Sequence, residues 1–292
     1  MSLAITLLGT GCPVAHPDRR GAAQLVETGS TKLLVDCGSG VAQQLVAAGT
    51  RGADIDALLV THYHSDHLVD FYQLVVSSWH QGRTRPWTIY APATVLAHMT
   101  KQMAAWRDER ELRIAFERRP NGEAAFHLDA HELAPGAFGN WDGLAVEAIE
   151  VDHEPILPAY GFRFSDGDAT LVLSGDTRPC AAIETAARGA DLLVHEVYIH
   201  DQLPITPGHR TAETLAAVSS YHTLPTDLAQ LAARAGVKAL ALTHFVPPVF
   251  DRPKLLEQIT AHYAGPVIVG EDLMRIAVDA RQVTWSRVTM RY

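Results

Sequence analysis

The chain has 292 residues, of which 47% are hydrophobic, and its mean hydropathy is close to zero. This composition suits a globular protein with a large buried core. No apolar run approaches the roughly 20 residues needed to span a bilayer, which argues against a membrane protein. The formal net charge is −9, so the field of the whole molecule would repel a polyanion such as nucleic acid.

The N-terminal sequence MSLAITLLGTGCP has no basic residue before its apolar segment. A first strand at residues 4–8 is therefore expected rather than a signal peptide, and the protein is expected to be cytoplasmic. The three cysteines are far apart and form no C-x-x-C pair. They predict neither a disulfide framework nor a thiolate zinc site.

Strand-like and helix-like segments alternate along the first half of the chain. Strands are expected at residues 4–8, 24–28 and 32–36, followed by a helix at 40–48 and a short strand at 57–60. Apolar residues then recur at helical spacing, which predicts a helix with Ser65 as its N-cap. A longer helix is expected over residues 93–113, and β-rich sequence over 125–173.

From Pro179 the expected order is a helix, a strand at 191–195, an irregular segment, a helix at 226–235 and a strand at 239–243, then a helix and two terminal strands. Two successive β-then-α halves predict an α/β protein. We expect an αββα sandwich, in which two facing mixed β-sheets carry helices on their outer faces. No Pro/Gly/Ser-rich linker marks a boundary, so a single domain over residues 1–292 is predicted.

The segment THYHSDH, residues 61–67, crowds three histidines and one aspartate into six positions. His62 and His64 are two residues apart in extended chain, which places both imidazoles on one side. Asp66 and His67 are adjacent at a helix start, so they diverge and can serve a second centre. This combination of imidazole and carboxylate favours zinc or a similar first-row ion; a solvated polar loop is the alternative.

One cluster cannot complete two metal sites, so further ligands must come from other loops. His153, Asp176 and His244 each stand at the end of a predicted strand. Taken alone, such a residue more often caps a helix or joins a buried hydrogen-bond network. Their joint placement predicts that all three are ligands.

In this order, THYHSDH, His153, SGDT and LTH resemble the five metal-binding motifs of the metallo-β-lactamase fold. LLGTGCP and LLVDCGSG are similar to that family's opening strands. The resemblance implies that His62, His64 and His153 hold one zinc ion and that Asp66, His67 and His244 hold the other. It also implies that Asp176 bridges the two ions together with a hydroxide. The implied cofactors are two Zn²⁺, with Mn²⁺ or Fe²⁺ as alternatives.

Two more motifs, DLLVHEV and YHT, resemble those shared by tRNase Z and the arylsulfatase-like metallohydrolases. The resemblance implies that Glu196 orients His222, which helps to protonate the leaving oxygen. With Asp66, these residues form the predicted catalytic set. The alternative is a buried Glu–His pair that only fastens a loop.

The spacing of the motifs favours the arylsulfatase-like branch. Only 22 residues separate His153 from Asp176, which leaves no room for the protruding arm common in tRNase Z, and FVPPVF after His244 lacks that family's Arg-Tyr pair. We therefore predict a dinuclear zinc hydrolase of small anionic esters, aryl sulfates or phosphodiesters, that forms a homodimer. We do not expect nucleic acid or a membrane as a partner. An arm-less tRNA 3′-end endonuclease is the alternative, and a non-catalytic metal-binding module is a third.

Overall fold

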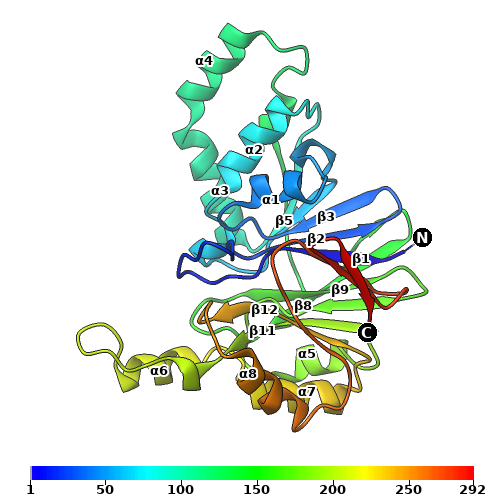
Figure 1. Cartoon of the computed structure of the whole chain (residues 1–292). Helices are drawn as coiled ribbons and strands as arrows, with labels where there is room; N and C mark the ends of the chain where they lie inside the picture. The colour runs from blue at the N-terminus through cyan, green and yellow to red at the C-terminus, as the bar shows by residue number, and fades with distance from the viewer. Residues whose placement is uncertain (1) are drawn as a thin grey trace.

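Two β-sheets pack face to face in the computed structural model, which describes residues 2–292, and helices cover their outer faces (Figure 1). Nine strands form one sheet in the order β16-β15-β14-β1-β2-β3-β4-β5-β6, and seven form the other in the order β13-β12-β11-β10-β9-β8-β7. Both sheets contain parallel and antiparallel pairs. The predicted αββα sandwich is therefore confirmed.

The elements have the following bounds. The first sheet contains β1 (Ala4–Gly9), β2 (Ala23–Thr28), β3 (Thr31–Val35), β4 (Ala57–Leu59), β5 (Trp87–Ala91), β6 (Leu128–Glu132), β14 (Met274–Ala277), β15 (Gln282–Trp285) and β16 (Val288–Arg291). The second contains β7 (Gly136–Trp141), β8 (Leu144–Val151), β9 (Ala159–Ser165), β10 (Thr170–Leu173), β11 (Leu192–Tyr198), β12 (Leu240–Val246) and β13 (Val267–Val269). The helices are α1 (Val41–Ala47), α2 (Phe71–His80), α3 (Ala93–Ala105), α4 (Arg107–Glu117), α5 (Ala181–Ala186), α6 (Ala212–Ser219), α7 (Pro225–Ala235) and α8 (Arg252–Thr260).

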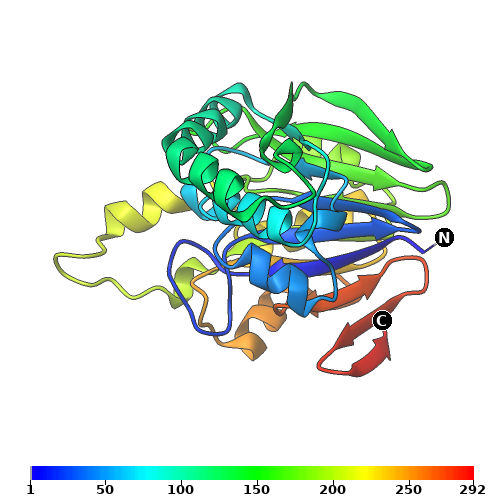
Figure 2. The ribbon, with the colours of Figure 1, turned by 90° about the horizontal axis from the view of Figure 1, so that it is seen from above.

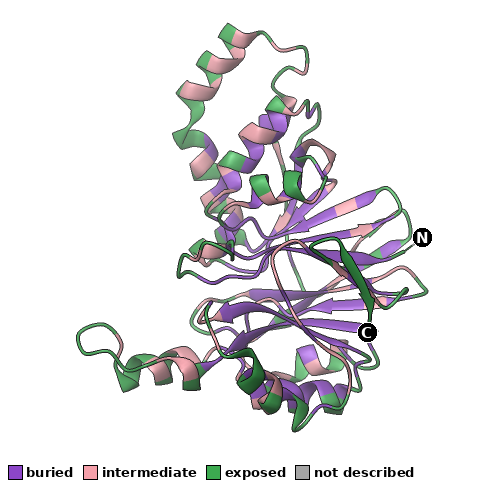
Figure 3. Ribbon diagram, in the orientation of Figure 1, coloured by how far each residue is buried: buried purple, intermediate pink, exposed green. Residues whose placement is uncertain are grey.

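Three apolar layers hold the sandwich together. Apolar residues of both sheets, among them Phe162 and Leu192, fill the space between the sheets. Leu74 of α2 packs with the other helix residues on the outside of the first sheet, and Leu231 of α7 does so on the second. The central strands, such as β1 and β11, are accordingly buried along their whole length, whereas the edge strands β6 and β16 and the helices α4 and α6 are largely exposed (Figure 3). Within residues 2–292, no helix has the length and apolarity needed to cross a membrane.

The helix expected from Ser65 begins later than predicted. Residues Ser65–His67 form a single 3-10 turn, and α2 starts at Phe71. The backbone between them is tied to the loop after β3, because the amide of Cys37 donates to the carbonyl of His67 (2.8 Å). This tie fixes the turn that carries Asp66 and His67, so a continuous α-helix cannot start at Ser65.

The long helix expected over residues 93–113 is two helices, α3 and α4, that meet at Trp106. The Trp106 ring stacks on Tyr72 of α2, with ring centroids 5.2 Å apart and an interplanar angle of 12°. Helix α3 buries Val95, Met99 and Met103, whereas α4 buries none of its residues. The chain therefore turns where its fully buried positions end, and α4 extends away from the sandwich (Figure 1).

Two further differences lie in the second half of the chain. The segment expected to be irregular after β11 contains α6, whose N-cap Thr211 accepts a hydrogen bond from the amide of Thr214 (3.2 Å). This helix projects from one edge of the sandwich in both ribbon views (Figures 1 and 2). Four strands rather than two follow α8, and three of them extend the first sheet.

Replacement of Phe162 by alanine should destabilise the protein by about 3–5 kcal/mol, because it leaves a cavity between the two sheets. Phe162 is fully buried and lies edge-on to Phe138. Urea unfolding of the two proteins measures the difference. The matched control is Phe116→Ala on α4, where the ring is 90% exposed and the expected change is within about 0.5 kcal/mol. Equal stabilities for the two variants would contradict the assigned core.

Candidate metal centre

The predicted metal ligands come together at the edge of the sandwich from which α6 projects. Residues 62–67 follow β4, His153 follows β8, Asp176 follows β10, and His244 lies near the end of β12. These segments belong to both sheets, and their side chains converge in two groups. All seven ligands predicted from the sequence are included, and we propose both groups as metal sites.

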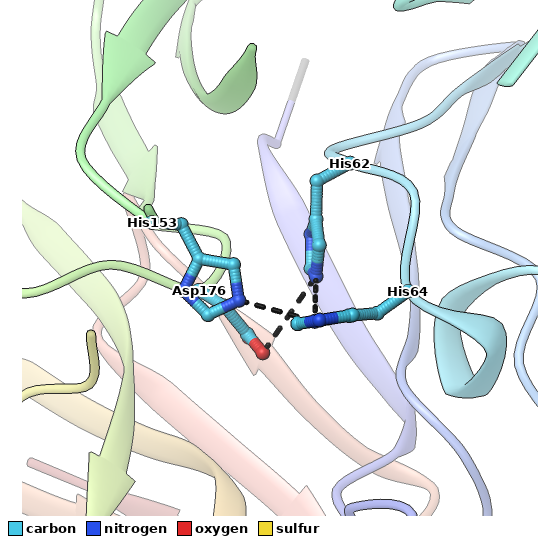
Figure 4. Close-up of side chains that lie close together, drawn as sticks. All are labelled: His62, His64, His153 and Asp176. Carbon is cyan, nitrogen blue, oxygen red and sulfur yellow. Dashed lines mark hydrogen bonds and ion pairs between the residues drawn. The ribbon is translucent and has the colours of Figure 1, made fainter. Parts of the chain in front are cut away.

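The first group consists of His62, His64, His153 and Asp176 (Figure 4). The Nδ1 atom of His64 lies 3.0 Å from Nε2 of His62 and 3.1 Å from Nε2 of His153. The Oδ2 atom of Asp176 is 3.9 Å from Nε2 of His62. Three ring nitrogens and one carboxylate oxygen thus point at a common centre.

The second group consists of Asp66, His67 and His244. Nε2 of His244 lies 3.2 Å from Oδ2 of Asp66 and 3.3 Å from Oδ2 of Asp176. Nε2 of His67 is 3.4 Å from the same Asp176 oxygen. Asp176 therefore lies between the groups, which is the position that a bridging ligand requires.

The spacing of these atoms fits metal coordination. With bonds of about 2.0–2.1 Å, two ligand atoms of a tetrahedral zinc site lie roughly 3.3 Å apart, close to the separations in both groups. Nε2 of His67 is buried and has no hydrogen-bond partner among residues 2–292. A buried polar atom without a partner is costly, and a cation between His67 and Asp176 would satisfy it.

Neighbouring groups hold three of the imidazoles in the orientation that metal binding needs. Thr61 donates its hydroxyl to Asp36 (2.9 Å), so Nδ1 of His62 donates to Thr61 Oγ1 (2.9 Å). Nδ1 of His67 donates to Asp36 (2.7 Å), and Nδ1 of His153 donates to the carbonyl of Tyr221 (2.9 Å). In the neutral form of each ring this leaves the Nε2 lone pair facing the centre.

Asp36, Thr61 and Tyr221 were not among the residues predicted from the sequence. The motif LLVDCGSG contains Asp36 and was assigned only to an opening strand. Asp36 follows β3 with a positive φ of 60°, which is uncommon for a residue other than glycine. That backbone directs its carboxylate toward Thr61 and His67. In the sequence, the only sign of this role is that a polar residue follows a buried strand.

His244 takes its position through a β-bulge. In the pairing of β11 with β12, Glu196 lies opposite Thr243 and Val197 opposite Phe245, so His244 is the extra residue. Its φ is 44°, in the left-handed region. The bulge turns the imidazole out of the ladder and toward Asp66 and Asp176.

Burial and charge set the protonation of the two groups. Desolvation by burial lowers the pKa of His62 well below its usual value and that of His64 to about 4, so both rings are neutral at pH 7 and have lone pairs available. Burial alone would raise the pKa of Asp176, but the charges of His244 and His67 hold it well below the usual range. The same carboxylate raises the pKa of His67, against the effect of burial, so metal binding there must displace a proton.

A Glu–His pair lies beside the metal ligands. Nδ1 of His222 is 2.9 Å from Oε1 of Glu196, and the amides of Thr177 and Thr223 donate to the same oxygen (3.2 and 3.1 Å). Burial would lower the pKa of His222, but the charge of Glu196 outweighs it and raises the pKa to about 9. His222 also lines a cleft of about 290 Å³ together with His64, Asp66 and Asp176. The pair predicted from the sequence therefore forms and faces the proposed metal centre.

This fold and this arrangement of histidines and aspartates define a metal-dependent hydrolase. The family described as "Beta-lactamase superfamily domain" matches residues 31–245, and the chain belongs to this superfamily. The structure is similar to the metallo-beta-lactamase fold protein YhfI from Bacillus subtilis, with a TM-score of 0.72 and 19% identity over 94% of this chain and 99% of that one. It is also similar to human tRNase Z, short form, with a TM-score of 0.64 and 22% identity over 94% and 99% of the two chains.

Curated relatives from mycobacteria match at higher identity. A protein named Ribonuclease Z from Mycobacterium sp. (strain KMS) is 37% identical over 280 residues, which cover 94% of this chain and 96% of the relative. The Ribonuclease Z of Mycobacterium marinum (strain ATCC BAA-535 / M) is 34% identical over 96% of this chain and 100% of its own length.

These relatives contradict the predicted arylsulfatase-like function, so the expectation of a hydrolase of small aryl sulfates or phosphodiesters was wrong. It rested on the short segment between His153 and Asp176, on the missing Arg-Tyr pair after His244 and on the acidic net charge. The relatives align over nearly their whole length with nearly the whole of this chain, so little room remains for an additional arm in them. A missing arm therefore does not distinguish this chain from proteins named Ribonuclease Z, and the alternative reading is favoured.

Replacement of Asp176 by alanine should remove most of the bound metal, because this carboxylate lies between the two ligand groups. Metal analysis of purified protein is expected to give close to two ions per chain for wild type and well below one for Asp176→Ala. Asp168→Ala, a change of the same kind at an exposed turn, is the control and should keep both ions. Full occupancy in Asp176→Ala would refute the bridging position.

Proposed function

We propose that this chain is a metal-dependent endoribonuclease of the Ribonuclease Z type, which removes the 3′ trailer from precursor tRNA. The observation that carries the proposal is the identity of 34–37% to proteins named Ribonuclease Z over almost the entire chain. The site geometry is compatible, since two ligand groups and a Glu–His pair meet in one cleft. A single domain over residues 1–292, a cytoplasmic location and a homodimer remain predictions.

The two ligand groups would hold the metals, and zinc suits their nitrogen and oxygen donors. His62, His64 and His153 would hold one ion; Asp66, His67 and His244 would hold the other; Asp176 would contact both. When bound, such a pair supplies Lewis-acid activation of water and of the phosphate. Asp66 contributes to catalysis in this proposal as a ligand in the wall of the cleft.

His222 is proposed to supply the proton that the leaving oxygen needs. Glu196 accepts from Nδ1, so Nε2 is the nitrogen left to carry a proton to the substrate. The raised pKa keeps this ring protonated at neutral pH, as a general acid must be. Thr177 and Thr223 hold the carboxylate through their amides, and this fixes the direction of the imidazole.

Zinc-loaded protein is expected to cut a precursor tRNA at one position at the 3′ end of the tRNA sequence. The rate should fall as salt rises, because contacts to phosphates release counterions on binding. Gel analysis of the end-labelled precursor measures both. His64→Ala, which lacks one ligand, should be inactive, and mature tRNA should remain intact. A precursor left uncut by protein that contains two metals per chain would overturn the proposal.

The role of His222 can be separated from that of the metals through the leaving group. A ribose alkoxide leaves with difficulty unless it is protonated, whereas a phenolate, whose parent acid has a pKa of about 10, leaves more easily. His222→Ala should therefore slow RNA cleavage by about 10²–10⁴-fold but slow an aryl phosphodiester far less. The measurement is kcat/KM for both substrates, and equal losses would mean that His222 is structural.

Glu196→Gln serves as the companion variant, because it keeps the shape and removes the charge. A general acid works while it is protonated, so wild-type activity that depends on His222 should be present below pH 9 and fall as the pH rises through about 9. Without the negative charge the pKa of His222 drops, and the alkaline fall should move to lower pH. An unchanged pH–rate profile would exclude the proposed coupling.

A further inference from the structure

A second cavity, of about 380 Å³, lies next to the proposed metal centre. It opens between the loop that carries His64 and helix α3, and its walls are Tyr63, Ser65, Leu68, Val69, His98 and Gln102. Its volume falls within the range of small-ligand sites, about 300–1,000 Å³. Neither the metal ligands nor the Glu196–His222 pair line it, so the proposed chemistry does not explain it.

The aromatic wall of this cavity is held in place by the metal-binding loop. His62 and His64 project to one side of extended chain, so Tyr63 between them projects to the other, toward α3. Its hydroxyl lies 3.1 Å from Nδ1 of His98, and the two rings meet edge to face with centroids 5.4 Å apart. Tyr63 is nevertheless 41% exposed. The ring is thus anchored at its hydroxyl while much of its surface remains open.

The cavity adjoins the cleft at the metal centre. Ser65 lies in the wall of both. His222 and Tyr221 line the cleft but not the cavity. They belong to the connection between α6 and α7, in the layer of the second sheet. The cavity belongs to the helices of the first sheet. A substrate that occupies the cleft can therefore reach His222 on one side and the cavity on the other.

The chemistry of the walls suits a planar group that carries hydrogen-bonding atoms. Tyr63 offers a ring for stacking, and Leu68 and Val69 offer aliphatic surface. The side-chain oxygen of Gln102 has no hydrogen-bond partner among residues 2–292, so this amide oxygen is not committed to the protein's own network. Sites that bind single-stranded RNA combine stacking on aromatic side chains with hydrogen bonds to the edge of the base.

We propose that this cavity binds a nucleobase of the RNA substrate, namely the base of the nucleotide that keeps the phosphate after cleavage. The inference rests on the proposed function. If His222 protonates the leaving oxygen, the nucleotide that departs lies on the side of His222. The other nucleotide then extends toward Ser65 and Tyr63. Stacking on Tyr63 fixes the phosphate relative to the metal ligands on either side of that residue.

The test uses two precursor RNAs that differ at one nucleotide. The products of wild-type cleavage first show which fragment carries the phosphate, and the terminal nucleotide of that fragment is then made abasic in the second RNA. Wild type should cut the base-containing RNA with a kcat/KM roughly 5- to 150-fold higher than the abasic RNA, the range expected for one base–aromatic stack. An RNA that is abasic on the other side of the scissile bond controls for a general effect of base removal.

Tyr63→Ala should lower kcat/KM for the base-containing RNA by a similar factor, and its loss should not add to that caused by the missing base. Tyr63→Phe keeps the ring and should retain most of the preference. Phe116→Ala, on exposed α4, removes an aromatic ring elsewhere and should leave the preference intact. If Tyr63→Ala binds less metal than wild type, Gln102→Ala on α3 replaces it. The same double-mutant cycle, two proteins measured on two RNAs, is then carried out at a residue away from the ligands.

Equal rates of wild type on the two RNAs would overturn this inference while the proposed function stands. Losses that simply multiply in the cycle would overturn it as well, because they would show that Tyr63 acts independently of the base. Wild-type protein that cuts neither RNA would overturn the proposed function and, with it, this assignment of the cavity.

Discussion

The charge of Asp176 is the constraint on which the rest of the site depends. Its carboxylate is 3% exposed, and its Oδ2 atom lies within 3.4 Å of ring nitrogens of His67 and His244. A carboxylate without water must be paired with positive charge, or folding is strongly opposed. The partners come from a loop of the first sheet and a strand of the second. One buried charge thus connects the two layers at this edge, and it contacts His244, whose backbone is left-handed.

Local features of the site and fold could be predicted because their signals are local. The spacing of His62, His64, Asp66 and His67 specifies donors on one loop, and alternation of apolar residues located the early strands to within about a residue. The start of α2 and the break at Trp106 depend on contacts with Cys37 and Tyr72, which lie far away in sequence. Asp36 and the carbonyl of Tyr221 act on ligands 31 and 68 residues away, and no local pattern encodes such pairs.

One argument behind the functional prediction, the net charge, used a property of the whole chain to decide a question about one cleft. Net charge counts every residue equally, whereas a polyanion responds mainly to the field near its binding surface. Four of the acidic residues that contribute to this charge are paired with imidazoles or backbone amides at the site: Asp36, Asp66, Asp176 and Glu196. Two divalent cations would add four positive charges there. The overall value of −9 therefore says little about how the centre attracts phosphate.

The order of the elements along the chain also bears on how the protein is made. β1 pairs with β14, so Ala4 can pair only after Ala277 has been synthesised. In the same way, Asp66 can contact His244 only after that residue has been synthesised. A ribosome releases the polypeptide from its N-terminus, and a nascent chain that has emerged only to α7 has neither the closing strand nor the last ligand. Interrupted translation before that point would yield fragments with an incomplete set of metal donors. The proposed set of metal ligands is consequently completed late in synthesis.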